Sequence, residues 1–201
     1  VIDRYFAAIA AQRLHPKAPR TTSFVYTALH GVGDRFARRA LSEAGFVDFQ
    51  SVEEQATPDG AFPTVRFPNP EEPGAMDQVL GLAQKLASEV ILANDPDADR
   101  LCVGIRTPSG KHRVLSGNEL GCLLAHYLLD QGEKGPDRLV VSSIVSSPML
   151  GAIAREHGAR WEQTLTGFKW IANRAIELER TAGLRFVFGY EEALGYSVGT
   201  T

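Results

Sequence analysis

The stretch VILANDPDADRLCVGI, residues 90–105, joins two apolar runs through a loop that carries three aspartates. Both runs consist of aliphatic and β-branched residues, which is typical of buried strands. Asp95, Asp97 and Asp99 stand at alternate positions between them, and Arg100 follows. Like charges this close repel each other, so the loop requires a positive partner, either the arginine or a bound cation.

Carboxylates are hard oxygen donors, which suit Mg²⁺ or Ca²⁺. In extended backbone, side chains at alternate positions share one side, so Asp95, Asp97 and Asp99 are expected to converge. An EF-hand loop does not fit, because Arg100 and Arg106 stand where that loop needs Gly and Glu. We expect a metal site with positions open for water or a phosphate oxygen. A solvated acidic turn between two strands is the alternative.

On both sides of this stretch, short apolar runs alternate with helical patterns. This alternation predicts an α/β fold of two consecutive three-layer domains, each a mixed, mostly parallel sheet with helices on its faces. The boundary is expected at 107–110, which gives domains 1–108 and 109–201. Strands are expected at 21–29, 46–52, 90–94, 101–107, 138–145, 159–164 and 184–190, and helices from residue 2 onward and at 34–44, 75–88, 117–130, 148–157 and 168–180.

Composition narrows the class of protein. With 201 residues, 44% hydrophobic and 22% charged, the chain is typical of a globular protein. The net charge of −3 gives no electrostatic reason to expect nucleic acid or a membrane as a partner. Cys102 and Cys122 are too far apart for a CxxC motif and lie in apolar surroundings, which favours reduced thiols and a cytoplasmic location.

A second candidate site is TLTGFKWI, residues 164–171. Thr166 and Gly167 precede a predicted helix, so backbone N–H groups at its N-terminus could face an anion. Lys169 in the first turn adds a charge suited to phosphate. A threonine N-cap with a surface lysine is the alternative interpretation.

A third candidate is FGYEEALGY, residues 188–196, in which Glu191 and Glu192 follow a predicted strand. Paired carboxylates there could bind sugar hydroxyls, or they could open a helix as acidic residues of its first turn. The turn HGVGD, residues 30–34, could approach a phosphate, but a purely structural turn is favoured.

Taken together, these stretches resemble the α-D-phosphohexomutase superfamily of phosphoglucomutases and phosphomannomutases. The family's metal loop reads D-x-D-x-D-R, and Asp95, Asp97, Asp99 and Arg100 match it in full. TGFKWI resembles the third-domain loop that meets the substrate phosphate, and GYEEALGY, residues 189–196, resembles the sugar-binding loop. LHGVG and FPNPEEPGA are also similar to passages of the second domain.

Members of this family have four domains, and the resemblance places this chain as domains II and III. Neither the T-x-S-H-N-P-like serine loop of domain I nor the R-x-S-G-T-like phosphate loop of domain IV is found in the sequence. The chain is therefore expected to be a central fragment whose partners are domains I and IV of the same parent chain. It is also expected to be inactive alone.

The resemblance implies an isomerase of the intramolecular phosphotransferase type. A phosphoserine donates its phosphoryl group to a sugar monophosphate, and the other phosphate of the resulting bisphosphate then returns to the serine. Mg²⁺ would be held by Asp95, Asp97 and Asp99. Arg100 would lie beside the transferring phosphate, and Lys169 would act as general acid or as an electrostatic stabiliser.

The resemblance also implies the substrate contacts. Thr166, Gly167 and Lys169 would meet the phosphate-bearing end of a sugar phosphate, and Glu191 would bind sugar hydroxyls. Ala193 stands where the family pattern often has Ser, which removes a hydroxyl and leaves a hexose or a pentose phosphate open as the substrate.

Two other functions are compatible with the residues. One is a Mg²⁺-dependent phosphohydrolase with Asp95 as nucleophile and Asp97 as acid. This function leaves TGFK and GYEEALGY without roles. The other is a non-catalytic module that binds a divalent ion or a sugar phosphate.

Overall fold

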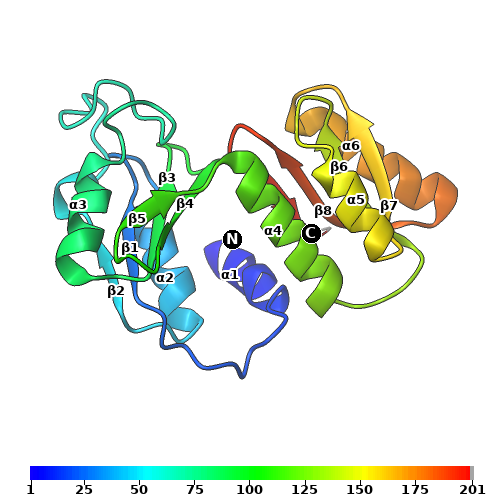
Figure 1. The fold of residues 1–201 in the computed structure, drawn as a ribbon, viewed down its shortest axis with the longest axis horizontal. Coiled ribbons are helices and arrows are strands. Elements are labelled where there is room, and N and C mark those ends of the chain that lie inside the picture. The colour runs from blue at the N-terminus through cyan, green and yellow to red at the C-terminus, as the bar shows by residue number, and fades with distance from the viewer. Residues whose placement is uncertain (200–201) are drawn as a thin grey trace. The chain divides into compact units, whose positions relative to one another are not determined.

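The computed structural model describes residues 1–199, which form two compact units, Val1–Leu115 and a second that begins at Ser116 (Figure 1). The first contains α1 (Ile2–Ala11), β1 (Phe24–Thr27), α2 (Asp34–Glu43), β2 (Phe49–Ser51), the 3₁₀ helix η1 (Glu53–Gln55), α3 (Asp77–Leu86), β3 (Val90–Asn94), β4 (Leu101–Arg106) and β5 (His112–Val114). The second contains α4 (Gly117–Gln131), β6 (Arg138–Ser143), α5 (Met149–Glu156), β7 (Arg160–Thr164), α6 (Phe168–Ala182), β8 (Arg185–Glu191) and β9 (Gly195–Val198). The predicted α/β class is confirmed.

The sheet of the first unit has the strand order β2-β1-β3-β4-β5. β2, β1 and β3 are parallel, whereas β4 and β5 are antiparallel to their neighbours. Alternate strand residues point to opposite faces. Val25 and Ile91 are therefore buried on one face, where the α3 residues Val79 and Ala83 are also buried. On the other face, Phe49 lies beneath the guanidinium of Arg38 from α2.

The sheet of the second unit has the order β7-β6-β8-β9, with β9 antiparallel to β8. α4 and α5 cover one face and α6 the other, which confirms the predicted three layers. Val140 of β6 packs in the cluster with α4 and α5, whereas its neighbours Leu139 and Val141 pack against α6. A bulge in the β6–β8 pairing places Phe186 on the α6 face and Phe188 on the opposite face.

The two units share one topology although no residue-level repeat is found in their sequences. In each, three parallel strands are followed by an antiparallel hairpin, β3–β4 in the first and β8–β9 in the second. The aspartate loop and the Glu191–Glu192 loop are the connections of these two hairpins. The candidate sites therefore lie at equivalent positions of the two sheets.

Two strands were missed by the sequence analysis. β5 lies between the predicted strand 101–107 and the predicted helix 117–130, and its three residues include a single aliphatic side chain. β9 follows the predicted sugar-binding loop with no apolar run of its own. Because β5 pairs with β4, the first unit extends to Leu115, beyond the expected boundary at 108/109.

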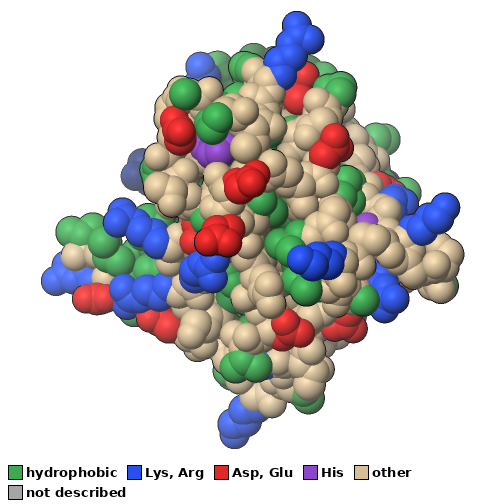
Figure 2. Space-filling model, turned by 90° about the vertical axis from the view of Figure 1, so that its left-hand side faces the viewer, with side chains coloured by type: hydrophobic (Ala, Val, Ile, Leu, Met, Phe, Trp, Pro, Cys, Tyr) green, Lys and Arg blue, Asp and Glu red, His purple; other side chains and the backbone are tan. Residues whose placement is uncertain are grey.

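Surface charge and helix length bear on possible partners. Acidic and basic side chains are interspersed on the face drawn in Figure 2. Among residues 1–199, no helix combines the length and the apolar character that a membrane crossing requires.

Candidate active site

The aspartate loop closes the β3–β4 hairpin as a turn. Asn94 and Leu101 are paired across the two strands, so residues 95–100 must reverse the chain. The N–H of Ala98 donates to the Asp95 carbonyl at 3.0 Å, and Ala98 has a left-handed φ of 62°. The expected reason for convergence, an extended backbone, is therefore wrong: the turn brings the aspartates together.

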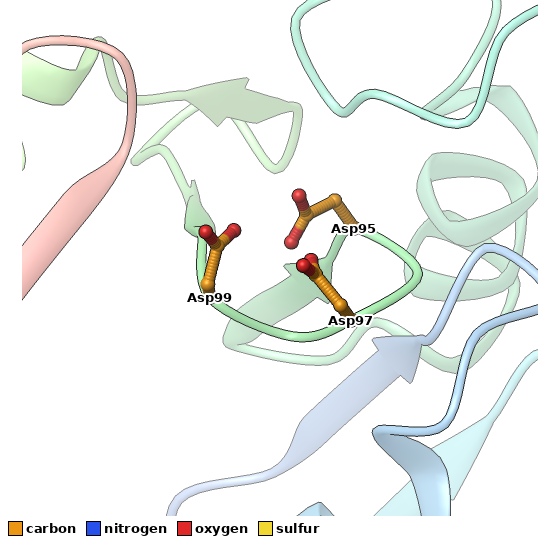
Figure 3. Close-up of side chains that lie close together, drawn as sticks. All are labelled: Asp95, Asp97 and Asp99. Atoms are coloured by element: carbon orange, nitrogen blue, oxygen red, sulfur yellow. The ribbon is translucent and has the colours of Figure 1, made fainter.

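The three carboxylates share one space above this turn (Figure 3). Each offers an oxygen, and these oxygens lie within 4.8 Å of one another. Asp95 is buried at 2% exposure, whereas Asp97 and Asp99 are exposed. The trio offers a group of hard oxygen donors with an open side, which suits a small divalent cation that retains other ligands.

Arg100 is bound most closely to the buried aspartate. Its Nε donates to Asp95 Oδ2 at 2.7 Å, and its backbone N–H donates to Asp95 Oδ1 at 3.1 Å. The same Nε is 3.7 Å from Asp99 Oδ1, a longer ion pair. One arginine thus fixes Asp95 and only partly compensates the charge of its neighbours.

The charge that remains is visible in the pKa of Asp99. Partial burial, and then the charges of Asp95 and Asp97, raise this pKa against the lowering effect of Arg100. The cluster therefore repels itself as it stands. A divalent cation would relieve this repulsion, so the residues fit a Mg²⁺ site.

A hydrogen-bonded brace holds the ends of the loop. Tyr26 on β1 donates its hydroxyl to Asn94 Oδ1 at 2.9 Å, and Asn94 Nδ2 donates to the Arg100 carbonyl at 2.5 Å. Burial first, then the charges of Asp34 and Asp95, raise the pKa of Tyr26, so this phenol remains a donor. The sequence analysis missed both Tyr26 and Asn94.

The turn HGVGD supports the same loop from below. A Cβ on Gly31 would collide with the backbone of Pro96, and Val32 donates its N–H to the Pro96 carbonyl at 2.8 Å. A Cβ on Gly33 would collide with the Tyr26 hydroxyl. These contacts agree with the structural-turn interpretation of this segment, since the glycines permit close packing under the aspartates.

A cavity of about 460 Å³ lies beside the loop within the first unit. Asp97 and Asn94 line it together with largely apolar side chains from α1 and α2, among them Ile9 and Phe36. This apolar lining does not suit a charged ligand, in contrast to the aspartate and arginine side of the loop.

In the second unit, Gly167 is the N-cap of α6, with a φ of 122° that favours glycine. Thr166 precedes the cap, so the alternative of a threonine N-cap is wrong. Thr166 and Lys169 are exposed, and Lys169 lies in the first turn of the helix, with its Nζ 5.7 Å from the Trp170 ring. The start of α6 thus presents a cation and a helix N-terminus together.

The predicted phosphate loop and sugar loop meet in a hydrogen bond. The backbone N–H of Gly167 donates to Glu191 Oε1. Glu191 is the last residue of β8, and Ala193 lies exposed in the β8–β9 connection. The structure therefore brings Gly167 and Glu191 together, with Thr166 and Lys169 on the same loop as Gly167.

Glu192 differs from its neighbour. Its Oε2 accepts hydrogen bonds from Ser143 Oγ at 3.1 Å and from Ser146 Oγ at 3.0 Å. Its backbone N–H donates to Ser146 Oγ at 3.1 Å. Glu192 thus anchors the hairpin to the loop after β6. Both serines lie in the serine-rich run VSSIVSS, residues 141–147.

Comparison with known proteins places these loops in a family. Residues 3–109 match the family model described as phosphoglucomutase/phosphomannomutase, alpha/beta/alpha domain II, and residues 116–201 match the model of domain III. The chain belongs to the phosphoglucomutase/phosphomannomutase family. The predicted resemblance is confirmed.

Named relatives of this chain support the same family. A probable phosphomannomutase of Haemophilus influenzae is 43% identical over 98% of this chain and 38% of its own length. A phosphopentomutase of Homo sapiens is 45% identical over 96% of this chain and 33% of its own length. The chain thus spans between a third and two fifths of these relatives, which are phosphosugar mutases by name.

A solved structure supports the fold. The crystal structure of a putative phosphomannomutase from Thermus thermophilus matches 97% of this chain and 41% of its own chain, with a TM-score of 0.75 and 22% identity. At this identity the match shows the shared fold alone.

Proposed function

We propose that this chain supplies the Mg²⁺ loop and the sugar-phosphate loops of a phosphosugar mutase, an isomerase that moves phosphate between positions of a sugar. The observation that carries the proposal is the convergence of Asp95, Asp97 and Asp99 beside Arg100 in a member of this family. Mg²⁺ bound there would neutralise charge on a transferring phosphoryl group.

The residues of the first unit have distinct roles in this proposal. Asp95 is the fixed ligand, because Arg100 holds both of its oxygens. Asp97 and Asp99 are the exposed ligands that adjust to the ion. The forked guanidinium of Arg100 lies at the edge of the cluster, where it can donate to a phosphate oxygen.

The second unit would bind the sugar phosphate. Lys169 and the N–H groups at the start of α6 are suited to a phosphate, with Lys169 also placed to donate a proton or stabilise charge on the phosphate-bearing oxygen. Glu191 is suited to sugar hydroxyls. Glu191 accepts a single internal hydrogen bond, from the Gly167 N–H to Oε1, so a ligand could engage its other oxygen or replace that bond.

The remaining parts of the reaction lie outside this chain. In our proposal a phosphoserine on domain I of the parent protein passes its phosphoryl group to the sugar monophosphate and regains one from the bisphosphate. The names of the relatives span hexose and pentose mutases, and Ala193 in place of the common Ser keeps both substrate classes open. The buried free thiols of Cys102 and Cys122 fit a cytoplasmic enzyme.

Calorimetry with MgCl₂ tests the proposal on the chain itself. We expect binding at about millimolar affinity, because three carboxylates leave several coordination positions of the ion to water. Asp97→Asn should weaken it at least tenfold, and Asp48→Asn, which changes an exposed aspartate outside the loop, should leave it unchanged. Equal binding by wild type and Asp97→Asn would refute the metal site.

A turnover assay with glucose 1-phosphate tests the mechanism separately. The isolated chain should show no conversion, and measurable mutase activity would contradict the requirement for a phosphoserine from another domain. Tight binding of glucose 6-phosphate without turnover by any longer form would instead favour a non-catalytic module.

The geometry counts against the phosphohydrolase alternative. An aspartate nucleophile needs a free, accessible oxygen, whereas Asp95 is 2% exposed and both of its oxygens accept hydrogen bonds from Arg100. A covalent phosphate trapped on Asp95 would reverse this conclusion.

A further inference from the structure

Two histidines of the second unit face each other. His126 lies in α4, and His157 directly follows α5. His157 Nε2 is 3.0 Å from His126 Nδ1, and the ring centroids are 5.0 Å apart. In this arrangement one ring nitrogen donates its proton and the other accepts it.

A buried arginine fixes the ends of the two helices that carry these rings. Arg138 is 4% exposed and donates from Nη1 to the Leu129 carbonyl of α4 at 2.7 Å. Its Nη2 donates to the carbonyl of His157, and its Nε to the Gly135 carbonyl at 2.9 Å. A cation at these carbonyls stabilises both helix C-termini. The imidazole pair is therefore held by the packing of the unit.

Asp130 supplies a negative charge on the same face of α4. It lies one turn after His126 on α4, so the two side chains are neighbours. The hydrogen bond from Gln131 is the largest cause that lowers the pKa of Asp130. The charges of Lys134, His126 and His157 also lower it. The carboxylate thus lies in the field of both rings.

We propose that His126 Nδ1 and His157 Nε2 form a two-nitrogen binding site for a borderline-soft divalent metal of the Zn²⁺ type, with water as the other ligands and Asp130 as the nearby anion. Two nitrogens bound to a tetrahedral zinc at about 2.0–2.1 Å are roughly 3.3 Å apart. A spacing of 3.0 Å therefore needs only a small separation of the rings. Imidazole donors select Zn²⁺ over Mg²⁺, whereas the all-oxygen aspartate loop has the opposite preference.

Metal binding requires a change of tautomer. The lone pairs of both facing nitrogens must point at the ion, so the proton between them moves to the far nitrogen of its own ring, His126 Nε2 or His157 Nδ1. No proton is released when both rings are neutral. Lys134 and Arg138 are the nearby cations that oppose the ion, and Asp130 is the anion that attracts it.

Such a site would clip the C-terminal end of α4 to that of α5. A ligand that binds only the folded state raises stability in proportion to the logarithm of its concentration over its dissociation constant. Zn²⁺ should therefore raise the melting temperature of this chain. Neither histidine belongs to the predicted metal, phosphate or sugar loops, so the proposed zinc site does not depend on the proposed reaction.

The test is a ZnCl₂ titration of the chain in millimolar MgCl₂, read by calorimetry and by the thermal shift. We expect one site that is weakened at least tenfold in His126→Ala and in His157→Ala, and about threefold in Asp130→Asn. His15→Ala, which removes an exposed histidine of the first unit, should bind as wild type does. His157→Ala should still fold, because Arg138 donates to the backbone carbonyl of residue 157 and not to its side chain. Circular dichroism checks the fold of each variant.

Three results would overturn the site. These are an unchanged Zn²⁺ affinity in His126→Ala and His157→Ala, a loss of Zn²⁺ binding only in Asp97→Asn, or displacement of the ion by Mg²⁺. The Mg²⁺ titration of the aspartate loop is scored independently, so either site can fail without the other.

Discussion

The hairpin loops of the two units place acidic residues at equivalent positions of equivalent sheets and use them in different ways. In the β3–β4 loop, three carboxylates point into one space, and one arginine binds mainly the buried member. In the β8–β9 loop, each carboxylate accepts hydrogen bonds from its own unit, Glu191 from Gly167 and Glu192 from Ser143 and Ser146.

The difference lies in the donors near each loop. Where uncharged N–H and O–H groups are within reach, a carboxylate is satisfied internally and becomes part of the framework. Where three carboxylates share a single arginine, negative charge remains in excess, and a bound cation would neutralise it. The two loops therefore differ in how much of their negative charge is compensated, and only the β3–β4 loop leaves charge that a bound cation would neutralise.

Replacement of the glycine that packs against each loop should have the largest effect on stability. A Cβ on Gly31 would collide with the Pro96 backbone, and one on Gly117 with the Glu192 backbone. Because backbone cannot rotate away, Gly31→Ala and Gly117→Ala should each lower the free energy of unfolding by about 3 kcal/mol. Urea denaturation measures this change.

Gly81→Ala is the matched control for both variants. This glycine lies inside α3 with no atom near its missing Cβ, so alanine should add up to about 1 kcal/mol of stability through helix propensity. Gly31→Ala should also lose Mg²⁺ binding, whereas Gly117→Ala should keep it. Equal Mg²⁺ affinity in Gly31→Ala and wild type would mean that the turn does not hold the loop.

The sequence revealed the charged cluster of the first loop but not the partners of the second, for a physical reason. All three aspartates and their arginine fall within residues 95–100, so local spacing reveals the whole cluster. The partners of Glu192 come from β6 and the loop after it, a contact that only the folded sheet creates. The same limit applies to the fold: apolar runs predicted the core strands, whereas β9 depends on pairing with β8.

The pH dependence of stability compares the buried thiols of the two units, Cys102 and Cys122. Burial first, and then the charge of Glu71, raise the pKa of Cys102 from near 9 to about 11. The folded state therefore disfavours the thiolate: this stability is fully present below about pH 8.5 and falls as the pH rises toward 11. The loss should reach about 2 kcal/mol.

Urea denaturation at several pH values, compared between wild type and Cys102→Ala, isolates this contribution from the other groups that titrate. For Cys122, burial raises the pKa, but hydrogen bonds with Tyr190 and Ser147 oppose it, so Cys122→Ala should change the pH slope less. A steeper effect from Cys122 than from Cys102 would reverse this order.

Replacement of Glu192 tests whether it belongs to the framework. Glu192→Ala removes the acceptor shared by Ser143 and Ser146, so the free energy of unfolding should fall by about 1–2 kcal/mol. Thermal denaturation measures this loss, and Mg²⁺ binding should not change. A neutral effect on stability would show that Glu192 does not belong to the framework.

The smallest expected effect is a gain in stability rather than a loss, and it comes from replacing Asp97. Asp97 is exposed and contributes to the repulsion that raises the pKa of Asp99. Asp97→Asn removes one of the repelling charges, so without metal the chain should be more stable by about 0.5 kcal/mol, even though Mg²⁺ affinity falls. The gain should shrink at high salt, because the repulsion between exposed charges is screened. Loss of stability in metal-free Asp97→Asn would show that this carboxylate, like Glu192, is held by its own unit, and the distinction between a framework loop and a ligand loop would fail.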